Sequence, residues 1–418
     1  MFKMKLVKLV AAAALLGIVG MLVYQIPAVN SRLSWRVDFA RTYLRGVVNP
    51  VEAMPTPLPQ PAVLVEEFAT PTIELAQPTL DELTPTPEVS PTSTPTPTAL
   101  PDYIALPPPS WEKQDINNCG PASLSMYLRF WGWQGDQFDI SEVIKPLRED
   151  RNVNVEEMDY YARTRAGWLN TEYRVGGNIE LLKAFLAESI PVLIEEGFIM
   201  DEAYWPNDDR WAGHYLLLTG YDEASQSFIA HDSFRGPDLY FTYETLNKNW
   251  QAFNRVYMLL YPPDREETVR RLLGPHWDVE YNRQYALEAA EAEIAADAED
   301  AFAWFNLGTN LVYFKRYGEA GRAYDQARVL GLPQRMLRYQ FGPFFAYFHT
   351  GRLDDLFAMT EYALARTPNS EEALLWHGWG LYRQGNQNEA VSYFQQALEA
   401  NPNYYDAQYA LDFVSESP

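Results

Sequence analysis

The spacing of apolar positions divides the chain into a mixed helical and extended region followed by a wholly helical one. Apolar residues recur at helical spacing over roughly 120–131, 155–164 and 178–188. Short apolar runs bounded by turn residues follow, and they predict strands at 191–194, 214–221, 227–231, 239–243 and 256–261. Helices followed by antiparallel strands are typical of an α+β domain, which we place at residues 111–263.

The rest of the chain has a helical period and contains an internal repeat. Seven positions between Trp304 and Ala327 recur between Leu374 and Ala397, with glycine and alanine at the same places. A degenerate copy lies between them, at about 337–368. The period of about 34 residues resembles that of the tetratricopeptide repeat, which implies an all-α solenoid that binds protein partners. We expect connecting helices at 264–300 and the repeats, with an end helix, at 301–418.

The first residues pair a short basic start with an uncharged apolar run over 9–29, broken only by Gln25. This run is close to the ~20 residues that span a bilayer and longer than the ~7–15 apolar residues of a cleavable leader. The sequence therefore predicts a signal anchor over 1–30, with a cleaved signal peptide as the alternative. Basic residues flank the run on both sides and leave its orientation open. The basic segment that follows is also suited to lie along lipid headgroups.

Proline dominates the next part of the chain, because 16 of the 30 prolines lie between Pro50 and Pro109. Proline fixes φ and removes hydrogen-bond donors, and few apolar residues are present to form a core. We therefore expect a disordered, extended stalk within residues 31–110 that holds the folded domains away from the membrane. Pro/Thr-rich stalks are typical of extracellular proteins. This favours a single-pass protein of the cell membrane with extracytoplasmic C-terminal domains, or a secreted protein if the leader is cleaved.

The charge is distributed unevenly along the chain. The net charge is −23 at pH 7, although residues 1–48 carry seven basic residues against one acidic residue. Everything beyond that basic segment is strongly acidic and would repel a phosphate backbone, so nucleic acid is excluded as a partner. The sequence has neither a Cys/His cluster with zinc spacing nor a glycine-rich phosphate loop. We therefore predict no metal and no organic cofactor.

The only cysteine, Cys119, lies in Gln114-Asp-Ile-Asn-Asn-Cys-Gly-Pro-Ala-Ser123, immediately before a strong helix start. Pro121 suits the first helical turn, and apolar residues continue the helix. The thiol would then lie at the positive end of the helix dipole, which favours thiolate. A lone cysteine cannot form an intrachain disulfide, so a nucleophile explains it better than a cross-link. A small buried core residue is the alternative.

A thiol nucleophile needs a base, a group that orients the base, and donors for the oxyanion. Of the five histidines, only His214 and His231 lie in the α+β domain. A hairpin turn at 222–227 would place Asp232 almost opposite His214, with a register free to slip by a residue or two. His231 would then point to the other face of the strand. Gln114, five residues before the cysteine, can supply a side-chain N–H beside the backbone N–H of Cys119.

These residues also match the motifs of a known family. Gln-x4-Cys-Gly-Pro-Ala-Ser, then Gly-His-Tyr with an aliphatic run ending Thr-Gly-Tyr-Asp, then a short strand ending in Asp, resembles the C39-like peptidases, which have a papain-like fold. The resemblance covers about residues 111–262 and implies that Cys119 is the nucleophile and His214 the general base and acid. Asp232 would orient His214, and Gln114 would donate to the oxyanion. One departure is Ser233, because proline often follows this aspartate in the family.

The sequence therefore predicts a membrane-tethered, extracytoplasmic cysteine peptidase that cleaves a peptide or protein substrate, with repeats that bind a protein partner. Two alternatives stay open. One is a catalytically silent papain-like binding module joined to a repeat scaffold, and the other is an acyltransferase that passes the thioester to an acceptor other than water. Residues 195–211 form an acidic and aromatic insert before His214, which either borders the substrate cleft or is a solvated loop.

Overall fold

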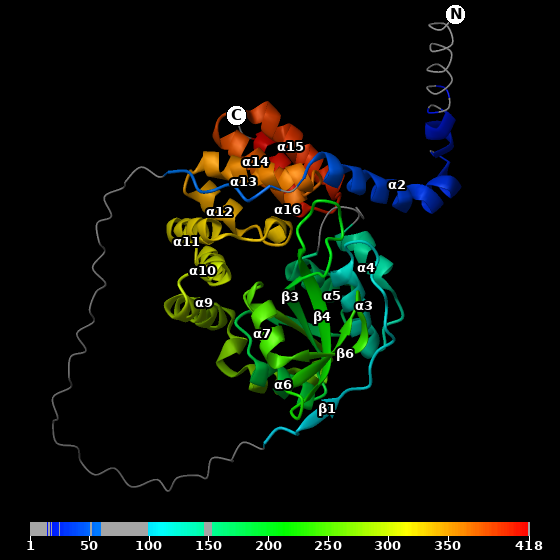
Figure 1. Cartoon of the computed structure of the whole chain (residues 1–418), viewed down its shortest axis with the longest axis vertical. Helices are drawn as coiled ribbons and strands as arrows, with labels where there is room; N and C mark the ends of the chain where they lie inside the picture. The colour runs from blue at the N-terminus through cyan, green and yellow to red at the C-terminus, as the bar shows by residue number, and fades with distance from the viewer. Residues whose placement is uncertain are drawn as a thin grey trace, which may run out of the picture.

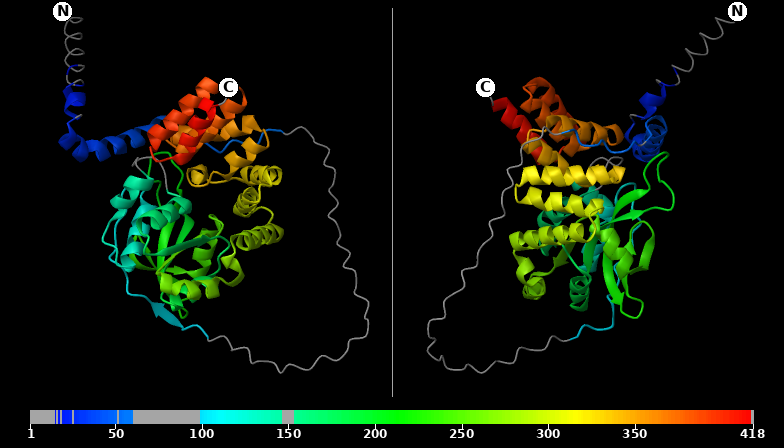
Figure 2. Two further views of the ribbon diagram at one scale, coloured as in Figure 1. Left: turned by 180° about the vertical axis from the view of Figure 1, so that it is seen from behind. Right: turned by 60° about the vertical axis from the view of Figure 1, so that its left-hand side comes forward.

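The computed structural model describes residues 15, 17, 19–24, 26–50, 52–59, 99–145 and 153–416. Figure 1 shows two lobes that lie against each other, a sheet with helices packed around it and a stack of helices. The views in Figure 2 show the same two lobes from other sides. The sheet lobe is the α+β domain that the sequence predicts, and the stack is the predicted repeat region.

Seven strands form one sheet in the order β2-β7-β3-β4-β5-β6, with β1 paired to β4, and every pairing is antiparallel. Strands β3 and β4 are almost wholly buried, because apolar residues occupy both of their alternating faces. The strands are β1 (Tyr103–Ala105), β2 (Asn170–Arg174), β3 (Val192–Ile199), β4 (Trp211–Asp222), β5 (Ser227–Asp232), β6 (Gly236–Thr242) and β7 (Tyr257–Tyr261).

Helices cover both faces of this sheet and form two cores. Leu193, Tyr215 and Leu217 face the core of α3 (Cys119–Phe130), α4 (Gln137–Ile144) and α5 (Val155–Arg165). The alternate residues Ile194 and Leu216 face the core of α6 (Ile179–Ala187) and α7 (Tyr243–Gln251). The period of two along each strand therefore supplies both cores from the same segments.

Helix α3 is buried from Cys119 to Leu128 and is fixed to the sheet by polar side chains. Ser123 Oγ donates to the backbone oxygen of Tyr215 at 3.3 Å. Tyr127 Oη donates to the Leu260 carbonyl at 3.1 Å and accepts from the Leu260 N–H at 2.8 Å. Because these bonds tie the helix to β4 and β7, they fix where its N-terminus, and so Cys119, lies relative to β4.

The second lobe contains paired helices stacked as repeats. Gly308 packs against the ring of Tyr324, and Gly378 packs against the ring of Phe394, so that an added Cβ would lie 2.6 Å from either ring. These are the repeated positions of the sequence, and small residues are required there because the helices of a pair approach closely. Helix α8 (Glu266–Leu273), between the 3-10 turns η1 (Pro263–Arg265) and η2 (Gly274–Trp277), still packs on the core of α6 and α7. The helices that follow are α9 (Val279–Ala296), α10 (Ala301–Tyr313), α11 (Tyr317–Leu330), α12 (Gly342–His349), α13 (Leu353–Arg366), α14 (Glu371–Arg383), α15 (Gln387–Ala400) and α16 (Tyr405–Glu416), with the 3-10 turn η3 (Gln334–Arg338).

The two lobes share a continuous apolar core. Tyr339 packs against Gly213 so closely that an added Cβ would lie 2.8 Å from the tyrosine ring. The side chains of Asn254 and Asn310 exchange hydrogen bonds of 2.9 and 3.3 Å across the junction. The repeats are thus packed directly onto the strand that carries His214.

The N-terminal region differs in part from the expectation. Residues after the predicted anchor form a 22-residue helix, α2 (Pro27–Val48), where we expected a basic segment leading into a disordered stalk. Nine of the 21 residues of the predicted apolar run, 9–29, lie outside the described residues. Among the helices that the structure does describe, none has the length and apolar character needed to cross a membrane.

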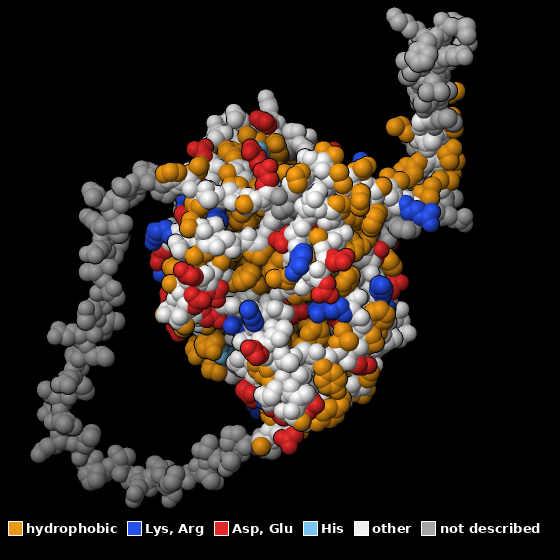
Figure 3. Space-filling view, viewed as in Figure 1, with side chains coloured by type: hydrophobic (Ala, Val, Ile, Leu, Met, Phe, Trp, Pro, Cys, Tyr) orange, Lys and Arg blue, Asp and Glu red, His pale blue; other side chains and the backbone are white. Residues whose placement is uncertain are grey.

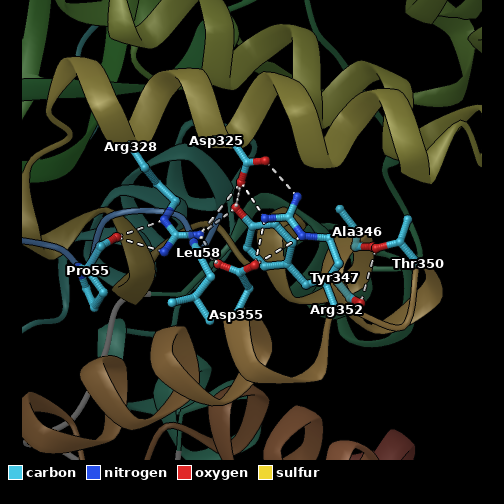
Figure 4. Close-up of polar contacts among 9 residues, drawn as sticks. All are labelled: Pro55, Leu58, Asp325, Arg328, Ala346, Tyr347, Thr350, Arg352 and Asp355. Atoms are coloured by element: carbon cyan, nitrogen blue, oxygen red, sulfur yellow. Dashed lines mark hydrogen bonds and ion pairs between the residues drawn. The ribbon is translucent and has the colours of Figure 1, made fainter. Parts of the chain in front are cut away.

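The two ends of the predicted stalk lie on the folded body. Residues 103–105 form β1 on the edge of β4, so the α+β domain begins before residue 111. Residues 52–59 run along the repeat helices, where Arg328 and Asp355 bond to their backbone (Figure 4). Extended proline-containing chain has unpaired carbonyls that such side chains can satisfy. The described ends therefore do not form a spacer, and the segment between them lies outside the described residues.

Candidate active site

Cys119 is the first residue of α3 and is 3% exposed. The loop before it is held by two buried polar side chains. Lys145 Nζ donates to the carbonyls of Ile116 and Asn117 at 3.1 and 2.7 Å. Gln137 Oε1 accepts from the Asn118 side chain at 2.8 Å and from a neighbouring backbone N–H at 2.7 Å. These bonds fix the entry to the helix and so the position of Cys119.

His214 lies near the start of β4 and bonds to Asp232 at the end of β5. Its Nε2 is 2.7 Å from Asp232 Oδ1, and both side chains are buried. Burial of the imidazole opposes its protonation, but the Asp232 carboxylate and hydrogen bonding with Cys119 raise the pKa of His214 to about 10. The structure therefore brings together three of the four predicted site residues, with the imidazole between the sulfur and the carboxylate.

The hairpin that carries these two residues has a different register from the one predicted. Asp232 pairs with Leu216, two residues beyond His214, because the turn lies further along and the register shifts between Leu218 and Gly220. A shift of two residues keeps Asp232 on the same face as His214, so the pair still meets diagonally. His231 points away from the pair, as the alternation predicts, and its Nε2 lies 3.1 Å from the Pro109 carbonyl.

Gln114, the fourth predicted residue, is placed by Ser233. The backbone N–H of Gln114 donates to the Ser233 carbonyl at 2.9 Å. The Ser233 hydroxyl donates to Gln114 Oε1 at 2.9 Å. With Oε1 held by this hydroxyl, the amide nitrogen is the end of the side chain that is left to act as a donor. Ser233, the departure from the family pattern, thus orients the predicted oxyanion donor.

Asp232 also receives bonds that the sequence did not reveal. Its Oδ1 accepts from the backbone N–H groups of Phe234 and Arg235 at 2.8 and 2.9 Å, and its Oδ2 accepts from Arg235 Nε at 2.5 Å. Burial favours the neutral acid, yet His214 and Arg235 together hold the pKa of Asp232 below its usual range. The carboxylate therefore stays ionised beside the imidazole.

Arg235 is itself held by a buried carboxylate and two rings. Its Nη2 donates to Glu196 Oε1 at 3.1 Å, and Glu196 is fully buried. The guanidinium lies over the rings of Phe198 and Phe241, at 4.6 and 5.0 Å from their centroids. The sequence gives little indication that Arg235 and Glu196 support Asp232. Arg235 lies three residues past Asp232, but Glu196 is an acidic residue inside an apolar strand and cannot be paired from sequence alone.

A cavity of about 630 Å³ lies between the two lobes beside this site. Figure 3 shows hydrophobic side chains gathered in a hollow where the lobes meet. The sheet lobe contributes Tyr173 and Glu195 to its lining, and the repeat lobe contributes Tyr339 and Trp376. Burial raises the pKa of Glu195 well above its usual range, and the nearby charge of Cys119 adds to this effect. Glu195 thus links the cavity to the surroundings of Cys119, although none of the four predicted site residues is in the lining.

The predicted insert is shorter than expected, because its two ends belong to β3 and β4 and leave a loop over 200–210. That loop is not simply solvated. Trp205 is 5% exposed and its ring lies 5.1 Å from that of Phe39 in α2. Asp208 pairs with Arg335 at 2.8 Å and with Arg338 at 3.3 Å in the repeats. The loop therefore connects α2, the sheet lobe and the repeats.

The described residues contain one group of carboxylates close enough to share a cation, formed by Glu157, Glu371 and Glu372, whose oxygens lie within 4.8 Å of one another. Acidic groups of this kind are common in proteins without a bound ion. It includes none of the predicted site residues, and we assign it no role.

Taken together, the elements define an α+β sheet domain, in which a buried cysteine, histidine and aspartate lie together, beside a helical repeat lobe. Residues 103–258 match the model of the Peptidase_C39 like family, and residues 372–404 match that of the tetratricopeptide repeat. The chain thus contains a C39-like peptidase domain followed by tetratricopeptide repeats, as the sequence predicts. No curated protein matches the chain.

Solved structures that resemble the chain fall into the same two groups. Xylellain, a cysteine protease from Xylella fastidiosa, is 17% identical over 39% of this chain and 87% of that one, with a TM-score of 0.31. The peptidase domain of Streptococcus ComA is 14% identical over 38% of this chain and 98% of that one, with a TM-score of 0.27. YrrB, a tetratricopeptide-repeat protein with an unusual peptide-binding site, is 21% identical over 32% of this chain and 67% of that one, with a TM-score of 0.28.

Proposed function

We propose that the chain is a cysteine peptidase in which Cys119 attacks the carbonyl carbon of a peptide bond. The observation that carries this proposal is the buried bond of 2.7 Å between His214 and Asp232, with the imidazole hydrogen-bonded to Cys119. An imidazole whose pKa is raised in this way takes up the thiol proton and leaves an ion pair of thiolate and imidazolium.

The acylation step follows from this arrangement. The thiolate adds to the carbonyl carbon, and the carbonyl oxygen becomes an oxyanion that accepts from the Cys119 backbone N–H and the Gln114 amide. His214 then gives its proton to the leaving amine as the C–N bond breaks, and a thioester with Cys119 remains. Asp232 keeps the imidazole oriented and stabilises its positive charge.

Deacylation uses the same groups in reverse. His214 takes a proton from water, the resulting hydroxide adds to the thioester carbonyl, and the sulfur leaves as the carboxylic acid forms. We infer that a peptide binds in the cavity between the lobes, about half of whose lining comes from the repeats, and that the bound peptide extends from Glu195 toward Cys119. In this proposal the repeats help to bind the peptide or protein substrate as well as a protein partner.

The test is alkylation of the full chain by iodoacetamide across a range of pH, since Cys119 is its only thiol. We expect wild type to react at pH values where an ordinary thiol is protonated, and we expect His214→Ala to lose this reaction below about pH 7. Thiol counting after denaturation controls for oxidation of the sample. Identical profiles for the two proteins would refute the ion pair and, with it, the peptidase proposal.

We also propose that residues 1–30 anchor the protein in the cell membrane with the folded lobes on the extracytoplasmic side. The apolar run of the sequence and the proline-rich composition of residues 50–109 support this location. Carbonate extraction of membranes, followed by protease treatment of intact cells, tests it. A full-length chain that is released by carbonate, or that resists external protease until the cells are lysed, would contradict the proposal.

A further inference from the structure

An extended segment of the chain, residues 52–59, bonds to side chains of α11 and α13, and Figure 4 shows its Pro55 and Leu58 beside Arg328 and Asp355. Arg328 of α11 donates from Nε and Nη2 to the Pro55 carbonyl at 2.9 and 2.8 Å. Its remaining nitrogen, Nη1, bonds to Tyr347 Oη at 2.8 Å and to Asp355 Oδ1 at 3.1 Å. The Arg328 side chain has no exposed surface. The guanidinium is therefore fixed by the repeats on one side and completed by the segment on the other.

Asp355 binds a second backbone group of the same segment. Its Oδ1 accepts from the Leu58 N–H at 3.1 Å, and its Oδ2 accepts from Arg352 at 2.7 Å. Tyr362 Oη adds a third contact by donating to the Glu52 carbonyl at 2.9 Å. The repeats thus satisfy two carbonyls and one N–H of an extended chain. This is how a peptide ligand is held by its backbone.

The side chains of the segment explain why this stretch occupies the surface. Met54 is 8% exposed and belongs to the apolar core that runs through the repeats. The side chain of Leu58, in contrast, is 43% exposed. Prolines at 55, 57 and 59 favour an extended backbone and carry no N–H that would need a partner, so little conformational entropy is lost on docking.

We propose that this face of α11 to α13 is a peptide-recognition site for an extended, proline-containing segment with an apolar residue before the first proline, and that residues 52–59 are its resident ligand. The polar half of the site is built from the repeat side chains Arg328, Arg352 and Asp355, which also bond to one another, and with the segment in place Arg328 and Asp355 are buried. Because Arg328 would leave two donors without that carbonyl, the site is made for a backbone acceptor at this point.

The sequence contains two further Pro-Thr-Pro stretches, at 85–87 and 95–97, and each is preceded by threonine where the resident ligand has Met54. They carry the same backbone pattern without the apolar anchor, so residues 52–59 should be preferred. The resident ligand is also attached to the same molecule, and short tethers give effective concentrations on the order of millimolar. An external peptide of the same chemistry should therefore bind poorly until the resident ligand is displaced.

The experiment uses the full chain and a fluorescent peptide copying residues 50–60, with binding followed by anisotropy. Met54→Glu should release the resident ligand, and the peptide should then bind at least tenfold more tightly than it binds wild type. Leu58→Glu is the matched control, because it places the same charge on an exposed side chain of the segment and should behave as wild type. In the double variant Met54→Glu/Arg328→Gln, the peptide should bind no more tightly than it binds wild type.

Hydrogen exchange of the Leu58 amide provides a measurement that does not depend on the added peptide. This amide should be protected in wild type and in Leu58→Glu, and its protection should fall at least tenfold in Met54→Glu while that of the repeat helices is kept. Binding that is equally weak in all three proteins, or an unprotected Leu58 amide in wild type, would overturn the proposal. Protection that appears only at concentrations where wild type dimerises would overturn the assignment to the same chain.

Discussion

Each lobe contains a buried cluster of charged side chains. The first cluster, in the sheet lobe, contains His214, Asp232, Arg235 and Glu196. The second, in the repeat lobe, contains Arg328, Arg352 and Asp355, and the two differ in whether their own lobe supplies every hydrogen-bond partner. In the sheet lobe, the donors to Asp232 all come from residues 214–235, so the cluster is satisfied by its own lobe. In the repeat lobe, Arg328 is satisfied only when the distant Pro55 carbonyl is in place. Both clusters remove charged groups from water, which is costly unless each is paired.

The difference indicates what each cluster does. A cluster that is complete within its lobe keeps its charges fixed whatever else binds, and such a fixed field is what holds an imidazole protonated beside a sulfur. A cluster that needs a separate segment changes its energy when that segment comes or goes, which is the property of a recognition site. Substitutions in the two clusters should therefore have different effects on the thiol and on the docked segment.

Replacing the sulfur should remove the chemistry of the first cluster without disturbing either fold. Cys119→Ala should reduce peptide turnover by a factor on the order of 10⁴ or more, because the remaining oxyanion donors have no nucleophile to assist. Turnover is measured with a peptide library, and peptide binding at the repeats serves as the control that should not change. A loss of folding in circular dichroism would instead support a purely structural role for this buried residue.

The two arginines offer a matched pair of substitutions. Arg235→Met leaves Glu196 and Asp232 buried with fewer partners and should lower the free energy of unfolding by about 3 kcal/mol. It should also shift the pH profile of Cys119 alkylation. Arg328→Met should destabilise the docked segment and leave that profile unchanged. Denaturant melts and alkylation of both variants measure these effects, and an equal shift of the thiol profile in both would break the contrast between the clusters.

Much of the first cluster could be predicted from local sequence. The helix start after Cys119 and the strand that begins near His214 are local patterns, and both are present in the structure. The observed register differs by two residues from direct opposition, which is within the slip that the prediction allowed, and Asp232 stays on the face of His214 because side chains alternate with a period of two. An error of one residue would have placed it on the opposite face.

The parts that sequence could not supply depend on distant contacts. In the sequence, Glu196 is only a polar residue within an apolar strand. Its partner Arg235 is identified by the fold, which places the two side chains together. Strand β2 (Asn170–Arg174) is a polar stretch that forms because β7 offers it an edge, which no local propensity reveals. The proline-rich segment was interpreted as a stalk because nothing in its own composition indicates a partner, whereas Pro55 in its described part bonds to Arg328 of the repeat lobe.

The ion pair between His214 and Asp232 should make the free energy of unfolding depend on pH. The folded-state pKa of His214 is raised above 6.5, so its contribution is complete below 6.5 and is lost as pH rises toward about 10. The pKa of Asp232 is lowered from 3.8, so its contribution is present above 3.8 and is lost as pH falls below it. The ion pair should therefore stabilise the fold most between about pH 3.8 and pH 6.5.

Thermal melts of wild type and Asp232→Asn at pH 5.5 and pH 9.5 measure this effect. The difference in Tm between the two proteins should be roughly halved, or smaller still, at the higher pH. Arg328→Met serves as the comparison, since neither His214 nor Asp232 contacts it and its difference from wild type should stay constant. A gap for Asp232→Asn that widens with pH would contradict the assigned charge states.

The smallest expected effect concerns Ser233, which orients Gln114 without touching the thiol. Ser233→Ala removes the hydroxyl that donates to Gln114 Oε1 and lets the amide rotate, so oxyanion stabilisation is weakened but not lost. We expect kcat to fall about tenfold with little change in KM, since the interaction is needed chiefly in the transition state. Ser233→Thr keeps the hydroxyl and should recover most of the rate. A structural role alone would lower the melting temperature of both variants and would not separate kcat from KM. Because Ser233 also joins the loop before Cys119 to the end of β5, a rate that depends on this hydroxyl would show that the first cluster extends beyond its charged members.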